Sequence, residues 1–328
     1  MKLGQVLRGY RITTRPCNDG AGKCMWAVAE KDGREYFVKE FLDPRRPRPD
    51  SMGTAESKHL LLLQCAEFER RHWSVINRID PADLDAGNLV TAVDFFADGS
   101  RYYKVTRLLR HAELRHPHRL GPHQKSVLLG TLTDSIRLLH RLDIVHGDLK
   151  PENVLLNQPP GSDLYTAKLI DFDDSYVSGD PPPRDAIGGD TRYAAPEWLR
   201  YVRGDSATGP ERLTTAADLF AIALMIHAYL VGELPGYPAV HASPAEAVNA
   251  GDELRVDLRL HPHVADVLRA LLDRDPARRP PIADVAGVVS TPAVLATGHV
   301  DRPRVIATND VSRSPVRSTR LRINMGTA

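Results

Sequence analysis

The sequence predicts an α+β fold of two lobes, the first built on an antiparallel sheet and the second mostly helical. Roughly the first 108 residues contain apolar runs separated by short turn sequences, with one long helical stretch among them. From Lys125 onward the apolar residues recur at helical spacing instead. A chain of 328 residues, 42% of them hydrophobic, is long enough to form two such lobes.

Two pairs of apolar-rich runs predict two β-hairpins in the first lobe. Within each pair, the runs are separated by a short sequence containing Asp-Gly, which is typical of a tight hairpin turn. The turns fall at Asp32-Gly33 and at Asp98-Gly99. The paired runs are Met25–Glu30 with Glu35–Glu40, and Leu89–Phe96 with Arg101–Leu109.

The helices are predicted where apolar residues repeat every three to four positions. The longest helix covers residues 55–79, which contain no proline or glycine. It ends at Asp80-Pro81, because the residue before a proline disfavours the helical conformation. Another helix begins near Lys125. Two further apolar helices are expected at 216–231 and 263–273.

Composition excludes several classes of protein. The net charge of +1 argues against a nucleic-acid or membrane-surface binder, which usually carries a strong basic excess. Three cysteines are too few for a disulfide-rich secreted scaffold. The N-terminus is too polar for a signal peptide, and the most apolar run, Leu219–Val231, is about 13 residues where a membrane span needs about 20. We therefore expect a cytoplasmic protein with no nucleic-acid partner and no membrane insertion.

The last part of the chain, residues 291–328, has a different composition. Arginines are interspersed with Ser, Thr, Pro and Gly, and acidic residues are few. This pattern predicts a basic, disordered C-terminal tail. A solvated tail without a partner and a docking or autophosphorylation segment are both compatible with it.

The strongest chemical signal is the segment 146–156, with the sequence HGDLKPENVLL. Pro151 prevents a helix there, and apolar residues on both sides hold this short loop in place. A second apolar run ends at Asp171, and a hairpin is expected to join it to the first. Three polar residues thereby reach neighbouring strand ends: Asp148, Asn153 and Asp171.

These residue types suit phosphoryl transfer. One carboxylate can orient an attacking hydroxyl and accept its proton, and a lysine can neutralise charge on the transferring group. Carboxylate and amide oxygens are ligands that Mg²⁺ prefers. The sequence therefore predicts a phosphotransferase site on this loop.

The segment resembles the catalytic loop of protein kinases, whose family pattern is HRDLKPEN. The resemblance extends over about residues 8–290. It implies the bilobal protein-kinase fold, with an N-lobe over residues 1–108 and a C-lobe over residues 109–290. It also implies that ATP and Mg²⁺ are the cofactors.

The family's functional residues fall on matching positions of this chain. By the resemblance, Asp148 is the catalytic base and Lys150 contacts the γ-phosphate. Asn153 and Asp171 are the Mg²⁺ ligands. Lys39, in the sequence YFVK, matches the lysine that binds the α- and β-phosphates.

The carboxylate that pairs with Lys39 is expected on the long helix. Glu69 is the preferred candidate, because Trp73, Ile76 and Asn77 then fall where the family's helix ends. Glu67 is the second candidate and Glu56 the third.

The glycine-rich loop departs from the family pattern. Counted back from Lys39, its three glycine positions fall on Cys17, Asp19 and Gly22, whereas a shifted alignment uses Gly20 and Gly22. Glycine allows a close backbone approach to phosphate, and a carboxylate nearby would repel it. The other nucleotide-binding positions fall on Cys24 against adenine, Thr106 as gatekeeper and Leu108 in the hinge.

Downstream, the chain matches three structural positions of the family. Ala195-Pro196-Glu197 matches its APE motif, and Arg279 is expected to pair with Glu197, with both side chains buried. Asp218 begins an apolar helix, where the family's Asp braces the catalytic loop.

Three further residues depart from the pattern. Gly147 replaces an arginine that grips an activation-loop phosphate, so activity is not expected to await phosphorylation there. Asp173 replaces the glycine of DFG. Asp190 falls where the family has a threonine, with Thr191 one position along.

We therefore predict a Ser/Thr protein kinase of the bacterial, eukaryotic-like kind, since Lys150 follows the Ser/Thr pattern and the composition is rich in Ala and Arg. Two other functions remain open. A pseudokinase that scaffolds partners would explain the poor glycine loop and Asp173. A small-molecule phosphotransferase resembling aminoglycoside and choline kinases would explain Gly147 and Asp173. The protein substrate is not indicated, and any input is expected from a regulatory partner protein.

Overall fold

The computed structural model describes residues 1–19, 22, 24–48, 50 and 52–298 of the chain. Gly20 and residues 299–328 of the predicted tail lie outside these described residues. The described part of the chain forms two compact units. The first unit consists of Met1–Arg70 with Ala92–Leu109, and the second of Arg71–Thr91 with the chain from Arg110 onward.

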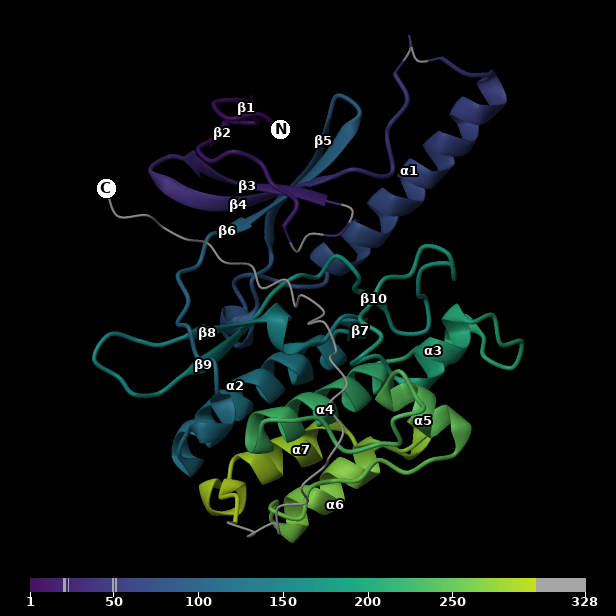
Figure 1. The fold of residues 1–328 in the computed structure, drawn as a ribbon. Helices are drawn as coiled ribbons and strands as arrows, with labels where there is room; N and C mark the ends of the chain where they lie inside the picture. Colours follow the sequence, from purple (N-terminus) through teal and green to yellow (C-terminus); the bar gives the residue numbers. More distant parts are fainter. Residues whose placement is uncertain (20–21, 23, 49, 51, 299–328) are drawn as a thin grey trace, which may run out of the picture. The chain divides into compact units, whose positions relative to one another are not determined.

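The first unit is built on one antiparallel sheet of six strands in the order β1-β2-β3-β4-β6-β5 (Figure 1). The two predicted hairpins are β3–β4 and β5–β6. In the β3–β4 turn, Asp32 and Gly33 both have positive φ, which matches the twist of the flanking strands. The strands are β1 Val6–Leu7, β2 Tyr10–Ile12, β3 Cys24–Lys31, β4 Arg34–Phe41, β5 Ala92–Asp98 and β6 Arg101–Arg107.

The two faces of this sheet bury different cores. One face carries a cluster of residues that includes Ala27, Val38 and Val105. The other face packs against helix α1 (Ala55–Ile76), because the ring of Phe68 lies 5.0 Å from that of Phe41 in β4. The same ring lies 5.0 Å from that of Tyr102 in β6. Alternation along the strands therefore decides which side chains face α1.

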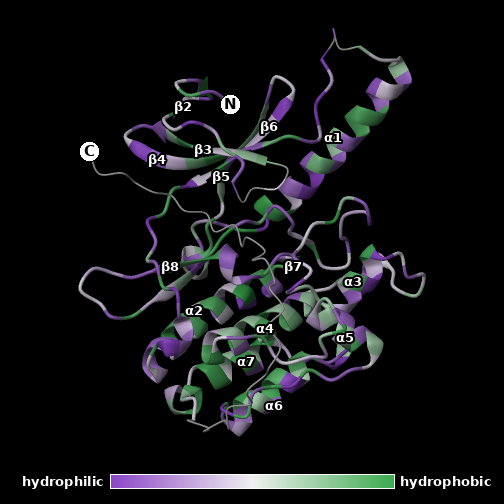
Figure 2. Cartoon of the chain, in the orientation of Figure 1, coloured by the Kyte–Doolittle hydropathy of each residue, from purple (hydrophilic) through white to green (hydrophobic). Residues whose placement is uncertain are grey.

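The second unit is helical around α4, which is buried along nearly its whole length and is green in Figure 2. Figure 1 shows α4 in contact with α2 and α6. Among the described residues, no helix is both long enough and apolar enough to cross a membrane. The helices are α2 Pro122–Arg141, α3 Pro196–Val202, α4 Ala216–Val231, α5 Pro244–Ala250, α6 Pro262–Leu271 and α7 Ile282–Val289.

Short strands and 3₁₀ turns frame the catalytic loop in this unit. The predicted hairpin is present as β8 with β9, and β7 pairs with β10. The strands are β7 Ile144–Val145, β8 Val154–Asn157, β9 Thr166–Leu169 and β10 Tyr176–Val177. The 3₁₀ turns are η1 Leu84–Asn88, η2 Pro117–Arg119, η3 Pro151–Asn153, η4 Pro210–Arg212, η5 Pro276–Arg278 and η6 Pro292–Leu295.

The end of α1 and the start of β5 each differ from the predicted residue by three positions. Helix α1 ends at Ile76 rather than at residue 79, because its last turn changes to i→i+3 hydrogen bonds, such as that from Arg78 N to Val75 O. Strand β5 begins at Ala92 rather than at residue 89. The backbone there leaves the predicted hairpin, since Val90 N donates to Leu169 O at 2.8 Å instead.

His227 of α4 is a buried histidine held in its neutral form. Its Nδ1 lies 2.7 Å from Glu233 O, and its Nε2 accepts from Asp257 N at 3.0 Å. A proton on Nε2 would face the Asp257 N–H, which is itself a donor. Burial lowers the pKa of His227, although Asp257 and Glu233 oppose this effect.

This histidine predicts a loss of stability in mild acid. The unfolded chain binds a proton near pH 6.5 while folded His227 does not, so the unfolding free energy should fall from about pH 7 downward, by at most about 1.4 kcal/mol per pH unit. His118, whose pKa is also lowered, acts in the same direction. Urea unfolding between pH 7.5 and 5.5 measures the slope. We expect His227→Gln to flatten the slope, while His123→Gln, at an exposed position, should not.

Candidate active site

Asp218 at the start of α4 braces the loop that begins at His146. Its Oδ2 accepts from His146 N at 2.8 Å, and its Oδ1 accepts from Gly147 N at 3.3 Å. The Nε2 of His140 lies 3.3 Å from the same Oδ2. Because Asp218 is 2% exposed, these contacts fix the loop backbone from inside the core. The bracing role predicted for Asp218 is therefore present in the structure.

Asp148 lies at the centre of the loop and is 8% exposed. Its Oδ2 accepts from Lys150 Nζ at 2.6 Å and from Asn153 Nδ2 at 2.9 Å. Its Oδ1 is buried and has no hydrogen-bond partner. A buried carboxylate oxygen without a partner is costly, so its presence points to a ligand group that donates to it. A hydroxyl is such a group.

Lys150 lies between two carboxylates. Its Nζ is 2.6 Å from Asp148 Oδ2 and 3.9 Å from Asp190 Oδ2. Burial disfavours the charge on this lysine, but the bond to Asp148 and the charges of Asp190 and Asp171 outweigh burial and raise its pKa. Lys150 therefore stays an ammonium ion. Asp190 takes the position nearest the loop, whereas Thr191 is exposed.

Asp171 lies two residues after the end of β9, next to Ile170, which contacts Asn153. The Ile170 N–H donates to Asn153 O at 3.0 Å, and His146 Nε2 lies 3.1 Å from Ile170 O. Asp171 itself has a φ of 64°, a conformation that Asp adopts more readily than most residues. The structure thus brings Asp148, Asn153 and Asp171 together in the second unit, as the hairpin predicted.

The residues present fit a magnesium ion that arrives with a nucleotide. Asn153 donates its amide N–H to Asp148 O at 2.7 Å, which orients its amide oxygen away from that carbonyl. This oxygen and the carboxylate of Asp171 are two hard donors. Mg²⁺ commonly takes only one or two protein ligands and completes its shell with phosphates and water. Asn153 and Asp171 would therefore hold the ion.

A cavity lies beside the catalytic loop in the second unit. Asp148 and Asp190 line it together with Tyr193 and Trp198. Tyr193 is buried, and its burial raises its pKa to about 12, so it stays protonated. Asp148, whose Oδ1 has no hydrogen-bond partner, therefore lines a cavity whose walls also carry the carboxylate of Asp190 and two aromatic side chains.

Gly147 has a conformation that requires glycine. Its φ is 81°, and a Cβ there would lie 2.4 Å from the backbone oxygen of Asp174. Asp174 in turn fills the space beside Gly188, and Gly189 packs close to Gly147 O. The contact between Gly147 and Asp174 was not predicted from the sequence. The pair Gly188-Gly189 was the one available signal that backbone segments pack closely there. No side chain at 147 fits while Asp174 keeps this position.

We predict that Gly147→Ala destabilises the protein and disturbs Asp148 next to it. Positive φ costs a residue with a side chain about 1–3 kcal/mol, and the overlap with Asp174 adds to that cost. Urea unfolding measures the change. Gly287→Ala in α7 is the matched control, because nothing lies within 4 Å of its added Cβ and alanine favours a helix. Equal effects at both positions would contradict the account of Gly147.

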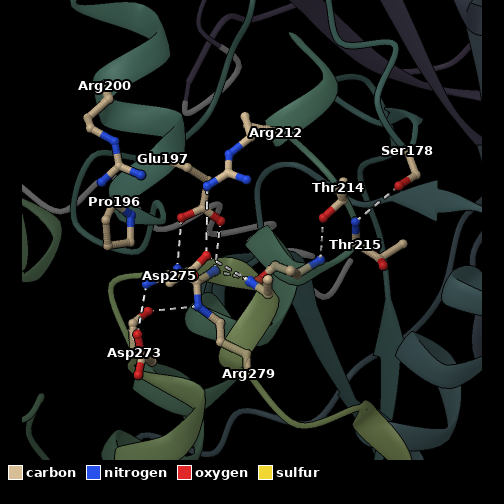
Figure 3. Close-up of polar contacts among 12 residues, drawn as sticks. Ser178, Pro196, Glu197, Arg200, Arg212, Thr214, Thr215, Asp273, Asp275 and Arg279 are labelled. Carbon is tan, nitrogen blue, oxygen red and sulfur yellow. Dashed lines mark hydrogen bonds and ion pairs between the residues drawn. The ribbon is translucent and has the colours of Figure 1, made fainter. Parts of the chain in front are cut away.

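Glu197 and Arg279 form the buried pair that the sequence predicts, shown in Figure 3. Arg279 donates to the two oxygens of Glu197 at 2.7 and 2.8 Å, and neither side chain is exposed. The same guanidinium donates to Asp273 O at 2.9 Å and to Ala216 O at 2.7 Å. The pair thereby ties α3 to the start of α4, which carries Asp218.

In the first unit, Lys39 lies in β4 and Glu69 lies on the sheet side of α1. Glu69 Oε1 accepts from Tyr102 OH at 2.6 Å and lies 3.8 Å from Arg46. Glu67 instead makes a two-point contact with Arg70, both distances being 2.8 Å. This placement favours Glu69, and its pairing with Lys39 stays a prediction. Glu56 is exposed near the start of the helix.

The nucleotide-binding positions in this unit also stay predictions. Cys24 begins β3 and is buried, and Gly22 has a φ of 54° with no atom near its Cβ position. Thr106 is the second-last residue of β6. Leu108 follows that strand, with its N–H donating to Glu35 O at 3.2 Å.

Comparison with known proteins gives one family and several curated relatives. The family described as the protein kinase domain matches residues 75–288. The chain is 26% identical over 277 residues to the serine/threonine-protein kinase ULK3 of Mus musculus. The aligned residues cover 83% of this chain and 52% of that protein. It is 28% identical over 195 residues to the serine/threonine-protein kinase ppk6 of Schizosaccharomyces pombe, covering 57% and 22%.

A third relative is the probable serine/threonine-protein kinase pXi of Dictyostelium discoideum. The identity is 34% over 159 residues, which are 47% of this chain and 20% of that protein. The chain thus spans about half the length of ULK3 and less of the other two relatives.

Proposed function

Since the chain belongs to the protein kinase domain family, we propose that it is a Ser/Thr protein kinase that transfers the γ-phosphoryl group of ATP to a protein hydroxyl. The relatives reported above are named as serine/threonine kinases. The observation that carries the proposal is the buried oxygen of Asp148 without a partner, beside Lys150 and Asn153.

Each residue of the loop has a role that follows from its contacts. Asp148 Oδ2 is held by two donors, which orients Oδ1. This oxygen can accept a hydrogen bond from the attacking hydroxyl and then take its proton. Lys150 remains charged and can leave Asp148 to contact the transferring group. Asn153 and Asp171 would hold Mg²⁺. When bound, Mg²⁺ and ATP supply a γ-phosphoryl group whose charge is partly neutralised.

Two observations favour a protein acceptor over a small molecule. Lys150, which contacts Asp148, is a residue of the protein-kinase branch of the family pattern. The buried pair of Glu197 and Arg279 belongs to the same branch. The sequence HGD and the acidic Asp173 resemble small-molecule kinases, so that acceptor class is the alternative to test.

The test measures ADP release with Mg²⁺-ATP and two sets of acceptors. One set is a library of Ser- and Thr-containing peptides, and the other is a panel of aminoglycosides and amino alcohols. We expect turnover with peptides only. Turnover with small molecules only would replace the proposal, and nucleotide binding without turnover on either set would make the chain a nucleotide-binding scaffold.

We also place this activity in the cytoplasm. ATP is available there, and none of the three cysteines, all within the described residues, forms a disulfide, as is usual in a reducing compartment. The protein substrate and any regulatory partner would meet the kinase in that compartment.

A further inference from the structure

A second lysine lies directly opposite Lys39 in the sheet. In the antiparallel pair β4–β6, Lys39 is paired in register with Lys104. Residues opposite each other across two strands point to the same face, with Cβ atoms about 4.5–5.5 Å apart. Lys39 and Lys104 therefore extend from one spot on the sheet, on neighbouring strands of the same unit.

The face that carries both lysines is the one that packs against α1. Phe41 and Tyr102 are two residues away from Lys39 and Lys104 along their strands, and both rings lie 5.0 Å from that of Phe68. Side chains two residues apart share a face. The residues next to these lysines along the strands, such as Val38 and Val105, belong to the core on the opposite face.

Lys104 is an unusual residue for this position. It is 7% exposed, and a strand position on a buried face normally holds an apolar side chain. Like charges directly opposite each other in a sheet are destabilising unless anionic groups face them. Glu69 supplies one carboxylate near this face, held by Tyr102 OH at 2.6 Å. A polyphosphate would bring several more negative charges to the same place.

We propose that Lys104 is a second phosphate-binding lysine, which acts beside Lys39 on the polyphosphate of the nucleotide. This inference rests on the proposed function, because it takes ATP as the ligand of this sheet face. It also gives a reason for the poor glycine loop. In the alignment that puts Cys17 and Asp19 at two of the glycine positions, close backbone contacts to phosphate are lost, and a second ammonium group would replace part of that attraction.

The test compares binding of ATP with binding of adenosine, each with Mg²⁺, by isothermal titration calorimetry. Lys104→Met keeps the length of the side chain and removes its charge. We expect it to weaken ATP binding about 10- to 100-fold, as the loss of one hydrogen bond to a charged group does, and to leave adenosine binding unchanged. Lys104→Arg should keep most of the ATP affinity.

Two controls separate this effect from a structural one. Lys31→Met removes a lysine at the far end of β3, whose Nζ donates to Arg8 O at 3.1 Å, and should change neither affinity. Lys39→Met should weaken ATP binding, and the double variant with Lys104→Met should weaken it further. Thermal melting shows whether each variant is folded.

The inference is overturned if Lys104→Met leaves ATP binding unchanged, or if it weakens ATP and adenosine equally. It is also overturned if Lys104→Arg loses as much ATP affinity as Lys104→Met. Failure of the proposed function gives a different result, in which wild-type protein transfers no phosphoryl group while the ATP-specific effect of Lys104→Met persists.

Discussion

Asp148→Asn should abolish phosphoryl transfer while leaving nucleotide binding intact. The amide keeps the size of the carboxylate and can still accept from Lys150 or Asn153, but it cannot take a proton from the attacking hydroxyl. Loss of a general base lowers turnover by about 10²- to 10⁴-fold. ADP release measures the rate, and calorimetric titration with Mg²⁺-ATP measures the affinity, which should stay within about twofold.

A matched control for this variant is Asp190→Asn. Asp190 lines the same cavity but lies 3.9 Å from Lys150 and makes no contact with Asp148 that would serve proton transfer. We expect a much smaller loss of rate from it. Equal losses from both variants would contradict the assignment of Asp148 as the base, and so would loss of nucleotide binding in Asp148→Asn.

Breaking the Glu197–Arg279 pair should give the largest loss of stability in the second unit. Neither side chain is exposed, so removing one charge leaves the other buried without its partner. Such a loss typically costs about 3–5 kcal/mol. We expect Glu197→Gln and Arg279→Met each to lower the unfolding free energy by about this amount, as measured by urea unfolding.

The double variant tests whether the cost arises from the pair itself. Once Glu197→Gln has removed the charge of the carboxylate, Arg279→Met no longer leaves a buried charge without a partner. The double variant should therefore lose less stability than the sum of the two single losses. The surface pair Arg269–Asp266, which is 54% and 70% exposed, is the control. Asp266→Asn should change stability by less than about 1 kcal/mol. Additive losses in the buried pair would show that its members stabilise the unit independently.

Local chemistry made much of the fold predictable. Asp32-Gly33 defines a hairpin through its own backbone conformation, and the apolar run of α4 can only be a buried helix in a chain of this kind. The catalytic loop was predictable because its polar residues lie within a few positions of one another. The short strands β1 and β2 were missed, since runs of two or three residues give no readable period.

Other features depend on contacts that the sequence does not display. The close packing of Gly147 against Asp174 joins residues on two sides of a hairpin, and only the backbone conformation shows it. The role proposed for Lys104 depends on the strand register, which places it opposite Lys39. The family match begins at residue 75, so the roles of Lys39 and Glu69 remain predictions.

Phosphosite mapping tests whether this chain is a Ser/Thr protein kinase. Wild-type protein and Asp148→Asn are incubated with Mg²⁺ and γ-labelled ATP, with and without a chelator, and the products are analysed by mass spectrometry. We expect phosphate on Ser or Thr that requires Mg²⁺ and is lost in Asp148→Asn. Label that persists in Asp148→Asn, or its absence from Ser and Thr while wild-type protein binds ATP, would contradict the claim that this chain is a Ser/Thr protein kinase.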